Sequence, residues 1–392
     1  MDKQTNTVHT QQMSPDAYGA LNMPVYHSAA FGFPSAKAMA DAFVGRTDAP
    51  TYSRVTNPTV TYFENRVRQL SGAQNVFAFN SGMAAISCTL MALAASGKNI
   101  VTSPHLFGNT VSLLKNTLGR FGVETRFVDL LDSEAVANAV DENTACLFLE
   151  IITNPQLEVA DLRILADIAH NRNVPLVADT TIIPFTQFGA SALGVDIEVV
   201  SSTKYISGGA TSLGGLVIDY GHFPQLYRSM KFELLYNLGS YMTPQVAFMQ
   251  TNGLETLDLR YRVQADNALE LAQRLRQVPE IKAVNYNGLP DNEFHEVAKK
   301  QFGGTYGAML TIDLEDKQSA FEFIDRLQLI SRATNLFDSK SLAIHPASTI
   351  FGAFAGSQRR AMNVRDTTVR LSIGMESVDD LYQDIIQAVR KD

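Results

Sequence analysis

The sequence predicts an α/β fold with a mostly parallel, seven-stranded sheet and a smaller α+β domain at the C-terminal end. Between about residues 57 and 220, short apolar runs alternate with helical patterns, which is typical of βαβ units with helices on both faces of a sheet. Beyond about residue 250, a long helix precedes widely spaced strands and helices. These observations predict three parts, an N-terminal arm (1–56), a large domain (57–250) and a small domain (251–392).

The arm contains scattered proline and glycine and no long periodic pattern, as in "NMPVYHSAAFGFPS". We therefore expect about 55 irregular residues at the start of the chain. Long irregular segments of compact proteins usually pack on another surface. We expect this arm to contact a neighbouring subunit.

Seven short apolar runs are the expected strands of the large domain: 75–79, 99–103, 125–130, 145–150, 175–179, 197–202 and 214–219. Helical patterns separate them at 83–95, 108–121, 133–140 and 162–173. Strands that read as continuous apolar runs are typical of parallel sheets covered on both faces.

The small domain is expected to begin with a long helix at 255–278. Strands are expected at 283–288, 307–314 and 369–375, and helices at 319–329 and 378–389. This mixture of spaced strands and helices is an α+β pattern.

Composition excludes several classes of function. A net charge of −8 and an isoelectric point of 5.4 disfavour nucleic acid or an anionic membrane as the main partner. The longest apolar stretch, 83–95, is shorter than the roughly 18 residues of a membrane span. The two cysteines, Cys88 and Cys146, lie in apolar runs without metal-binding or redox spacing, so we expect buried, reduced thiols and no metal. Together these features predict a cytoplasmic protein.

Polar residues follow four of the expected strands. Ser81 and Gly82 follow the first strand, Asn154 follows 145–150, Asp179 ends 175–179, and Lys204 follows 197–202. The carboxyl ends of parallel strands lie at one edge of a sheet. We therefore expect one site there.

The types of residue at this edge indicate its chemistry. A Ser-Gly turn at a helix start directs N–H groups at a phosphate, although Ser81 alone could be only a helix cap. Ser201 and Thr203 could add hydroxyl groups. Alone, Asp179 could be a turn residue and Lys204 a surface lysine.

Together, a phosphate site, a carboxylate and a lysine match pyridoxal 5′-phosphate, which needs a lysine for its aldehyde and a carboxylate for its ring nitrogen. The glycine-rich "SGGATSLGG" lacks the Gly-Lys-Ser/Thr of a nucleotide P-loop.

The chain resembles the Cys/Met-metabolism family of pyridoxal-phosphate enzymes, which includes sulfhydrylases, cystathionine synthases and lyases, and methionine γ-lyases. The resemblance is carried along nearly the whole chain by "YSRVTNPT", "NSGMAAI", "LFGNTV", "TNPQL", "VADTT", "SSTKYISGG", "SLAIHPAST" and "VRLSIGME". It implies fold type I of these enzymes, which is the aspartate aminotransferase-like fold.

The resemblance also implies roles for individual residues. Lys204 would carry the cofactor and move protons, and Asp179 would pair with its pyridine nitrogen. The remaining implied roles are phosphate binding by Gly82, Met83, Ser201 and Thr203, contact with a neighbouring subunit's phosphate by Tyr52 and Arg54, and binding of the substrate α-carboxylate by Asn154, Arg370 and the backbone around Ser341.

Two positions depart from the family pattern. Phe107 stands where the family usually has a tyrosine that stacks on the cofactor and assists proton transfer. Stacking can remain, but proton transfer would fall to Lys204 alone or to another group such as Tyr52, and altered or reduced activity stays open. Thr180 replaces a common asparagine beside the aspartate.

Within the family, "GGATSLGGLVID" and "SKSLAIHPAST" resemble the O-acetylhomoserine sulfhydrylases. Lys340 and Asn109 replace a glutamate and a cysteine that are associated with γ-lyases. We expect γ-replacement on O-acetyl-L-homoserine by sulfide or a thiol, which gives acetate and homocysteine or methionine, as in methionine biosynthesis.

The alternatives are a γ-lyase that forms 2-oxobutyrate, ammonia and a thiol, and a cofactor-binding protein without strong catalysis. The acyl group (acetyl or succinyl) and the donor (sulfide, methanethiol or a sulfur-carrier protein) stay open. The resemblance implies a homotetramer of two active dimers, and a dimer stays open.

Overall fold

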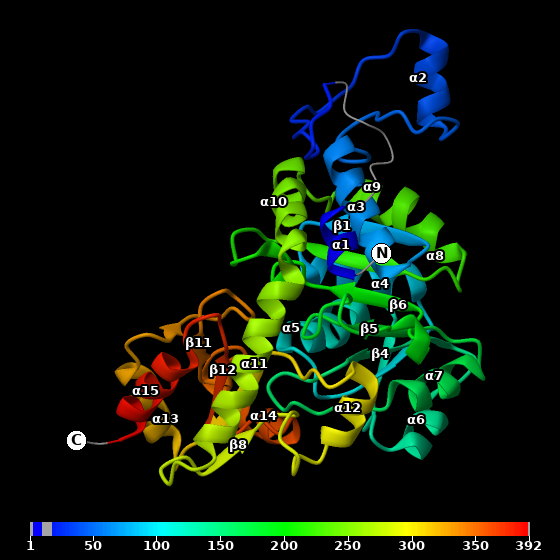
Figure 1. Ribbon diagram of the computed structural model, residues 1–392. Coiled ribbons are helices and arrows are strands. Elements are labelled where there is room, and N and C mark those ends of the chain that lie inside the picture. The colour runs from blue at the N-terminus through cyan, green and yellow to red at the C-terminus, as the bar shows by residue number, and fades with distance from the viewer. Residues whose placement is uncertain (1–2, 10–17, 391–392) are drawn as a thin grey trace.

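Two β-sheets organise the chain in the computed structural model, which describes residues 3–9 and 18–390 (Figure 1). The larger sheet has seven strands in the order β1-β7-β6-β5-β4-β2-β3. Their bounds are β1 Asn75–Phe79, β2 Asn99–Thr102, β3 Glu124–Phe127, β4 Thr144–Glu150, β5 Leu176–Asp179, β6 Ile197–Val200 and β7 Gly215–Asp219. Each of the seven expected strands is present, with bounds that differ by a few residues.

The larger sheet is mostly parallel, which confirms the prediction. Strands β3, β2, β4, β5 and β6 pair in parallel, whereas β7 runs antiparallel to both β6 and β1. Since β7 lies between β1 and β6, those two strands point the same way. The carboxyl ends of β1, β4, β5 and β6 therefore lie at one edge.

Alternate residues of the central strands belong to apolar clusters on opposite faces. In β4, Cys146 and Phe148 pack into one cluster, and Leu147 and Leu149 pack into the other. This burial of both faces explains why the strands read as continuous apolar runs rather than alternating ones. Both cysteines are free and buried, as predicted.

Helices cover both faces of the larger sheet, and their start and stop signals are local. Asn57 caps the first helix of this region by accepting a hydrogen bond from Thr59 N, and Gly72 ends it in a left-handed conformation. The helical segments are α3 Pro58–Ser71, α4 Gly82–Leu93, α5 Gly108–Ser112, η1 Leu113–Thr117, η2 Leu118–Phe121, α6 Ser133–Ala139, α7 Leu162–His170, η3 Ser191–Leu193, η4 Tyr205–Ser207, α8 Gln225–Arg228, η5 Ser229–Leu235, α9 Tyr236–Leu238 and α10 Pro244–Glu255. The helix expected at 108–121 is continuous but changes from α to π to 3-10 geometry.

The smaller sheet has five strands in the order β10-β11-β12-β9-β8. Their bounds are β8 Ala283–Asn285, β9 Met309–Asp313, β10 Ser331–Arg332, β11 Leu342–Ile344 and β12 Thr368–Ser372. Its helices are α11 Leu257–Leu275, α12 His295–Phe302, α13 Lys317–Arg326, η6 Pro346–Ser348, α14 Gly356–Ala361 and α15 Val378–Val389. Strands β10 and β11 were not predicted, because two or three residues show no periodicity.

The predicted domain boundary near residue 250 falls inside α10, which leads almost directly into α11 as one long rod (Figure 1). The division at this residue stays a prediction.

The N-terminal arm contains two helices, α1 Lys3–Val8 and α2 Ala36–Phe43, where only irregular structure was expected. Ser35 caps α2 by accepting a hydrogen bond from Ala38 N. The α2 segment projects from the rest of the molecule (Figure 1), and Phe43 is 68% exposed. Residues 1–2 and 10–17 of the predicted arm lie outside the described residues. Of the helices that are described, none is long and apolar enough to cross a membrane.

Candidate active site

The N-terminus of α4 forms one wall of the predicted site, directly after β1. Ser81 Oγ accepts a hydrogen bond from Ala84 N at 3.1 Å, so the capping role considered for this residue is present. Gly82 and Met83 are the first residues of the helix, and their N–H groups have no partner within the helix. These two N–H groups and the positive end of the helix dipole suit an anion.

Ser201 lies against this helix start. A Cβ atom added to Gly82 would stand 2.7 Å from Ser201 Cβ and 2.9 Å from its Oγ. The hydroxyl of Thr203 instead donates to Gly214 O at 3.1 Å and accepts from Gly214 N at 3.0 Å. Two hydroxyl groups were predicted to bind phosphate. That of Ser201 lies beside the helix N-terminus, whereas that of Thr203 is hydrogen-bonded to Gly214.

Asp179 and Glu150 lie side by side at the ends of β5 and β4, where the strand register pairs them. Asp179 Oδ1 accepts from Thr181 N at 3.0 Å, and burial raises the pKa of this carboxyl group. Burial and the charge of Asp179 raise the pKa of Glu150 to about 8. At neutral pH, Glu150 is therefore mostly protonated.

Glu150 also fixes the loop that carries Phe107. Its Oε1 accepts a hydrogen bond from Phe107 N at 2.6 Å, at the start of α5. Sequence reasoning placed Glu150 at a strand end but gave it no role. The signal that could have found it is its register opposite Asp179 on the neighbouring strand.

Lys204 follows β6 and points its amine at the smaller sheet. Lys204 Nζ donates to Asn335 Oδ1 at 2.6 Å. Burial and the positive charge of Arg370 lower the pKa of this lysine to about 8, against a smaller opposing effect of Asp179. A fraction of the Lys204 side chains is therefore uncharged near neutral pH.

Arg370 is almost completely buried in β12, with 2% of its surface exposed. Its Nη1 donates to Asn154 Oδ1 at 3.2 Å and its Nη2 to Asn335 O at 3.1 Å. Its Nε is buried and has no hydrogen-bond partner among the described residues. Burial lowers the pKa of Arg370 to about 9. A buried guanidinium with a free donor suits an anionic ligand such as a carboxylate.

Ser341 is engaged elsewhere. Its N–H donates to Glu376 Oε1 at 2.6 Å, its Oγ donates to Glu376 Oε2 at 2.9 Å, and its carbonyl accepts from Ser331 N. The structure instead places Asn335 beside both Lys204 and Arg370. Sequence reasoning missed Asn335, because "ATNLFDSKS" shows only turn-forming composition.

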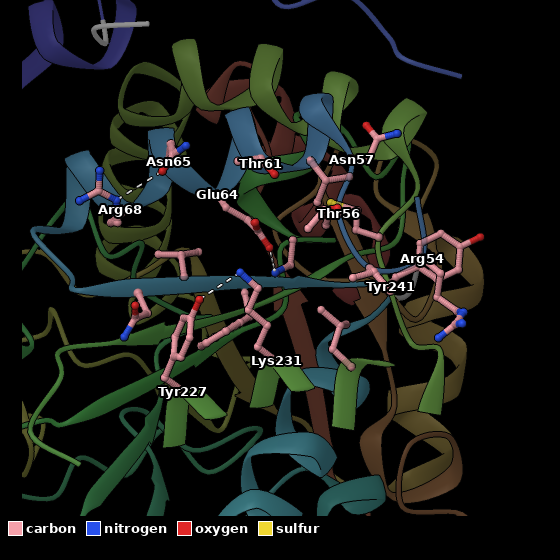
Figure 2. Close-up of a pocket in the computed structure, with 18 of the residues that line it drawn as sticks. Arg54, Thr56, Asn57, Thr61, Glu64, Asn65, Arg68, Tyr227, Lys231 and Tyr241 are labelled. Atoms are coloured by element: carbon pink, nitrogen blue, oxygen red, sulfur yellow. Dashed lines mark hydrogen bonds between the residues drawn. The ribbon is translucent and has the colours of Figure 1, made fainter. Parts of the chain in front are cut away.

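Tyr52 and Arg54 lie on the N-terminal arm. Arg54 donates to the backbone carbonyl of Tyr236 and lines a cavity of about 320 Å³ (Figure 2). The lining includes Glu64 and Lys231 but not Lys204, Asp179 or Arg370. Tyr52 is 45% exposed.

Comparisons with known proteins identify the family of this chain. A family model described as "Cys/Met metabolism PLP-dependent enzyme" matches residues 4–390. The chain belongs to this family. It uses pyridoxal 5′-phosphate and has fold type I, as the sequence predicted.

One similar protein is an O-acetyl-L-homoserine sulfhydrylase of Corynebacterium glutamicum, 34% identical over 97% of this chain and 95% of that protein. An L-methionine gamma-lyase of Fusobacterium nucleatum is 35% identical over 99% of this chain and 98% of that protein. A crystal structure of a putative O-acetylhomoserine (thiol)-lyase from Campylobacter jejuni has a TM-score of 0.95 and 32% identity, and covers 99% of this chain and all (100%) of that one. That structure contains N′-pyridoxyl-lysine-5′-monophosphate.

The residues present fit this cofactor. The start of α4 and Ser201 form a close cradle that a single added Cβ at Gly82 would fill. A carboxylate at Asp179 and a lysine of lowered pKa at Lys204 lie at the same sheet edge. The buried Nε of Arg370 still lacks a partner among the described residues. Helix dipole, carboxylate, amine and guanidinium thus match the phosphate, the ring nitrogen, the aldehyde and a substrate carboxylate, respectively.

Proposed function

We propose that this enzyme catalyses γ-replacement on O-acetyl-L-homoserine, with sulfide or a thiol as donor and acetate as leaving group. The observation that carries the proposal is the hydrogen-bonded series Lys204–Asn335–Arg370–Asn154, which sets a proton-transfer group beside a carboxylate-binding group. An α-amino acid needs both groups at once. The sulfhydrylase from C. glutamicum supports the ester substrate.

Bound pyridoxal phosphate supplies an electron sink that stabilises negative charge on the substrate carbons. The residues of the chain supply the proton transfers. With a pKa of about 8, roughly one Lys204 in ten is a neutral amine at pH 7, against about one in 2,500 for an ordinary lysine. Lys204 is therefore suited to remove the α proton and then a β proton of the substrate, before acetate leaves from the γ carbon.

Other residues hold the reacting groups. Asp179 would keep the cofactor's ring nitrogen protonated, because an opposite charge close by stabilises the protonated form. Arg370 and Asn154 would bind the substrate carboxylate through the guanidinium and the amide. Gly82, Met83 and Ser201 would bind the phosphate through the N-terminus of α4, with Thr203 holding the glycine turn behind it.

We propose that Tyr52 and Arg54 act across a subunit interface, at the neighbouring subunit's phosphate. Their position on the N-terminal arm and the exposed apolar residues of that arm support this role. An arrangement of two active dimers in a homotetramer would bury the arm. Phe107 has no hydroxyl, so Lys204 would transfer protons alone or with the neighbouring subunit's Tyr52.

We further propose that the enzyme works in the cytoplasm. Its two cysteines are free and buried, as suits a reducing compartment.

End-product analysis tests the activity. Purified holoenzyme is incubated with O-acetyl-L-homoserine, with and without sulfide, and homocysteine and 2-oxobutyrate are measured. Homocysteine that depends on sulfide, with little 2-oxobutyrate, is the expected result. Dominant 2-oxobutyrate would instead establish the γ-lyase, for which the F. nucleatum relative is the supporting comparison. Turnover of neither kind would favour a cofactor-binding protein with weak catalysis.

Variants and alternative substrates complete the test. Lys204→Ala should abolish turnover, and retention of turnover would overturn the proposed mechanism. Parallel assays with O-succinyl-L-homoserine, methanethiol and a thiocarboxylated carrier protein identify the acyl group and the donor.

A further inference from the structure

Asn335 is the point at which the two cationic side chains of the site meet. It lies in the turn between β10 and β11, half-buried, and it belongs to the smaller sheet's side of the site. Its side-chain Oδ1 accepts from Lys204 Nζ at 2.6 Å, and its backbone carbonyl accepts from Arg370 Nη2 at 3.1 Å. One residue thus presents two neutral oxygen atoms to two positive charges.

The segments around this contact hold it in register. Tyr205 directly follows Lys204, and Phe337 lies two residues after Asn335. Their rings stack with centroids 4.3 Å apart and planes within 10°. Tyr205 OH also accepts from Ala308 N at 3.2 Å. Stacked, buried rings restrict both backbones, so Asn335 stands in a prepared position rather than on a free loop.

The neutrality of Asn335 matters for both cations. A carboxylate at this position would stabilise the charged form of the lysine. It would also pair with Arg370 and so compete with the carboxylate of an amino-acid substrate. The neutral amide of Asn335 accepts a hydrogen bond from the lysine and stabilises its charged form much less than a carboxylate would, and it does not compete for Arg370 as an anion.

We infer that Asn335 is a positioning residue that receives the amine of Lys204 whenever this amine is free of the cofactor, and holds it beside Arg370 through a neutral oxygen. In this position the amine can act as a base while the guanidinium stays available to the substrate. The inference rests on the roles proposed above for Lys204 and Arg370 in γ-replacement. It adds Asn335 as a residue that influences the protonation of the Lys204 amine and leaves the Arg370 guanidinium available to the substrate carboxylate.

The test measures the lysine itself in the apoprotein. Wild type and variants are pulsed with a trace amine-reactive acylating reagent over a pH series, and modification of Lys204 is quantified by peptide mass spectrometry. The midpoint of reactivity reports the protonation of this amine. Asn335→Asp should raise the midpoint by about one to three pH units, because it places an opposite charge within hydrogen-bond distance. Asn335→Ala should lower the midpoint, because the ammonium loses its acceptor.

Asn116→Asp is the matched charge control. Asn116 is exposed on η1 and bonds only to Ser112 among the side-chain partners described. This variant should leave the midpoint unchanged. If Asn335→Asp does not fold, as judged by circular dichroism, Asn335→Ala alone decides the question.

The inference is overturned if Asn335→Asp leaves the midpoint at the wild-type value, or if the Asp and Ala variants shift it in the same direction. An Asn335→Ala midpoint equal to that of wild type would also overturn it. A second readout is kinetic, since Asn335→Asp should raise KM for the amino-acid substrate through competition at Arg370. The titration needs no turnover, so an error in the proposed reaction would leave its result valid.

Discussion

Replacing Arg370 by lysine keeps a positive charge but removes the planar, two-pronged donor. In the structure, Arg370 is 2% exposed, and its two terminal nitrogens reach Asn154 and Asn335 at 3.2 and 3.1 Å. A lysine ammonium at the end of a flexible chain cannot hold both partners and still present a donor to the substrate. We expect the variant to lose one hydrogen bond to a charged group.

Such a bond contributes about 1.5–3 kcal/mol. Since about 1.4 kcal/mol is a factor of ten, KM for the amino-acid substrate should rise about 10- to 150-fold. The fall in kcat should be much smaller, because the lost contact binds the substrate in its ground state as well as in the transition state. Initial rates over a range of substrate concentration, at saturating sulfide, separate the two constants.

Arg260→Lys provides the control. Arg260 is a half-buried arginine, and it donates to two backbone carbonyls, Tyr205 O at 2.7 Å and Gly253 O at 2.6 Å. Burial lowers its pKa to about 10. Its replacement should lower thermal stability without the selective rise in KM. A KM for Arg370→Lys within about threefold of wild type would refute the proposed carboxylate-binding role.

Three further predictions concern the cofactor cradle, the partly buried carboxylate Glu64 and the core. Gly82→Ala should weaken pyridoxal phosphate binding about 5- to 150-fold in spectroscopic titrations, because overpacking at a 2.7 Å approach to Ser201 costs about 1–3 kcal/mol. Burial raises the pKa of Glu64 to about 7 from an ordinary 4.5, so this group's contribution to stability falls as pH rises between those values. Glu64→Gln should therefore increase the melting temperature at about pH 8 but not at about pH 4. Phe337→Ala removes a ring that is 1% exposed and should lower the unfolding free energy by about 3–5 kcal/mol in denaturant titrations.

Matched variants control these measurements. Gly32 has no atom within 4 Å of an added Cβ, so Gly32→Ala should bind cofactor like wild type. Phe121 is 67% exposed, and Phe121→Ala should change stability by less than about 0.5 kcal/mol. Equal cofactor affinity in Gly82→Ala and wild type would contradict the close cradle. A melting temperature of Glu64→Gln that follows wild type at both pH values would contradict the burial of its charge in the cavity of Figure 2.

The short elements and the contacts between distant segments could not be predicted from the sequence. Strands β10 and β11 are too short for a period to be seen, and α2 was hidden among proline and glycine. The helix at 108–121 was predicted, but its change to π and 3-10 geometry was not, because the apolar spacing is compatible with all three.

The sequence by itself determined the mostly parallel sheet, the cofactor and the family. Alternating strands and helices are local patterns, and in a parallel sheet the strand ends must meet at one edge, so Asp179 and Lys204 could be assigned to one site without coordinates. Only the tertiary structure decided which group accepts the hydrogen bond of the lysine amine, because Asn335 lies 131 residues away, in a turn between two strands of the other sheet. It also showed that Ser341 bonds to Glu376, and that Glu150 shares a buried edge with Asp179. Hydrogen-bond partners and shifted pKa values depend on three-dimensional distance and burial, and a linear chain contains neither.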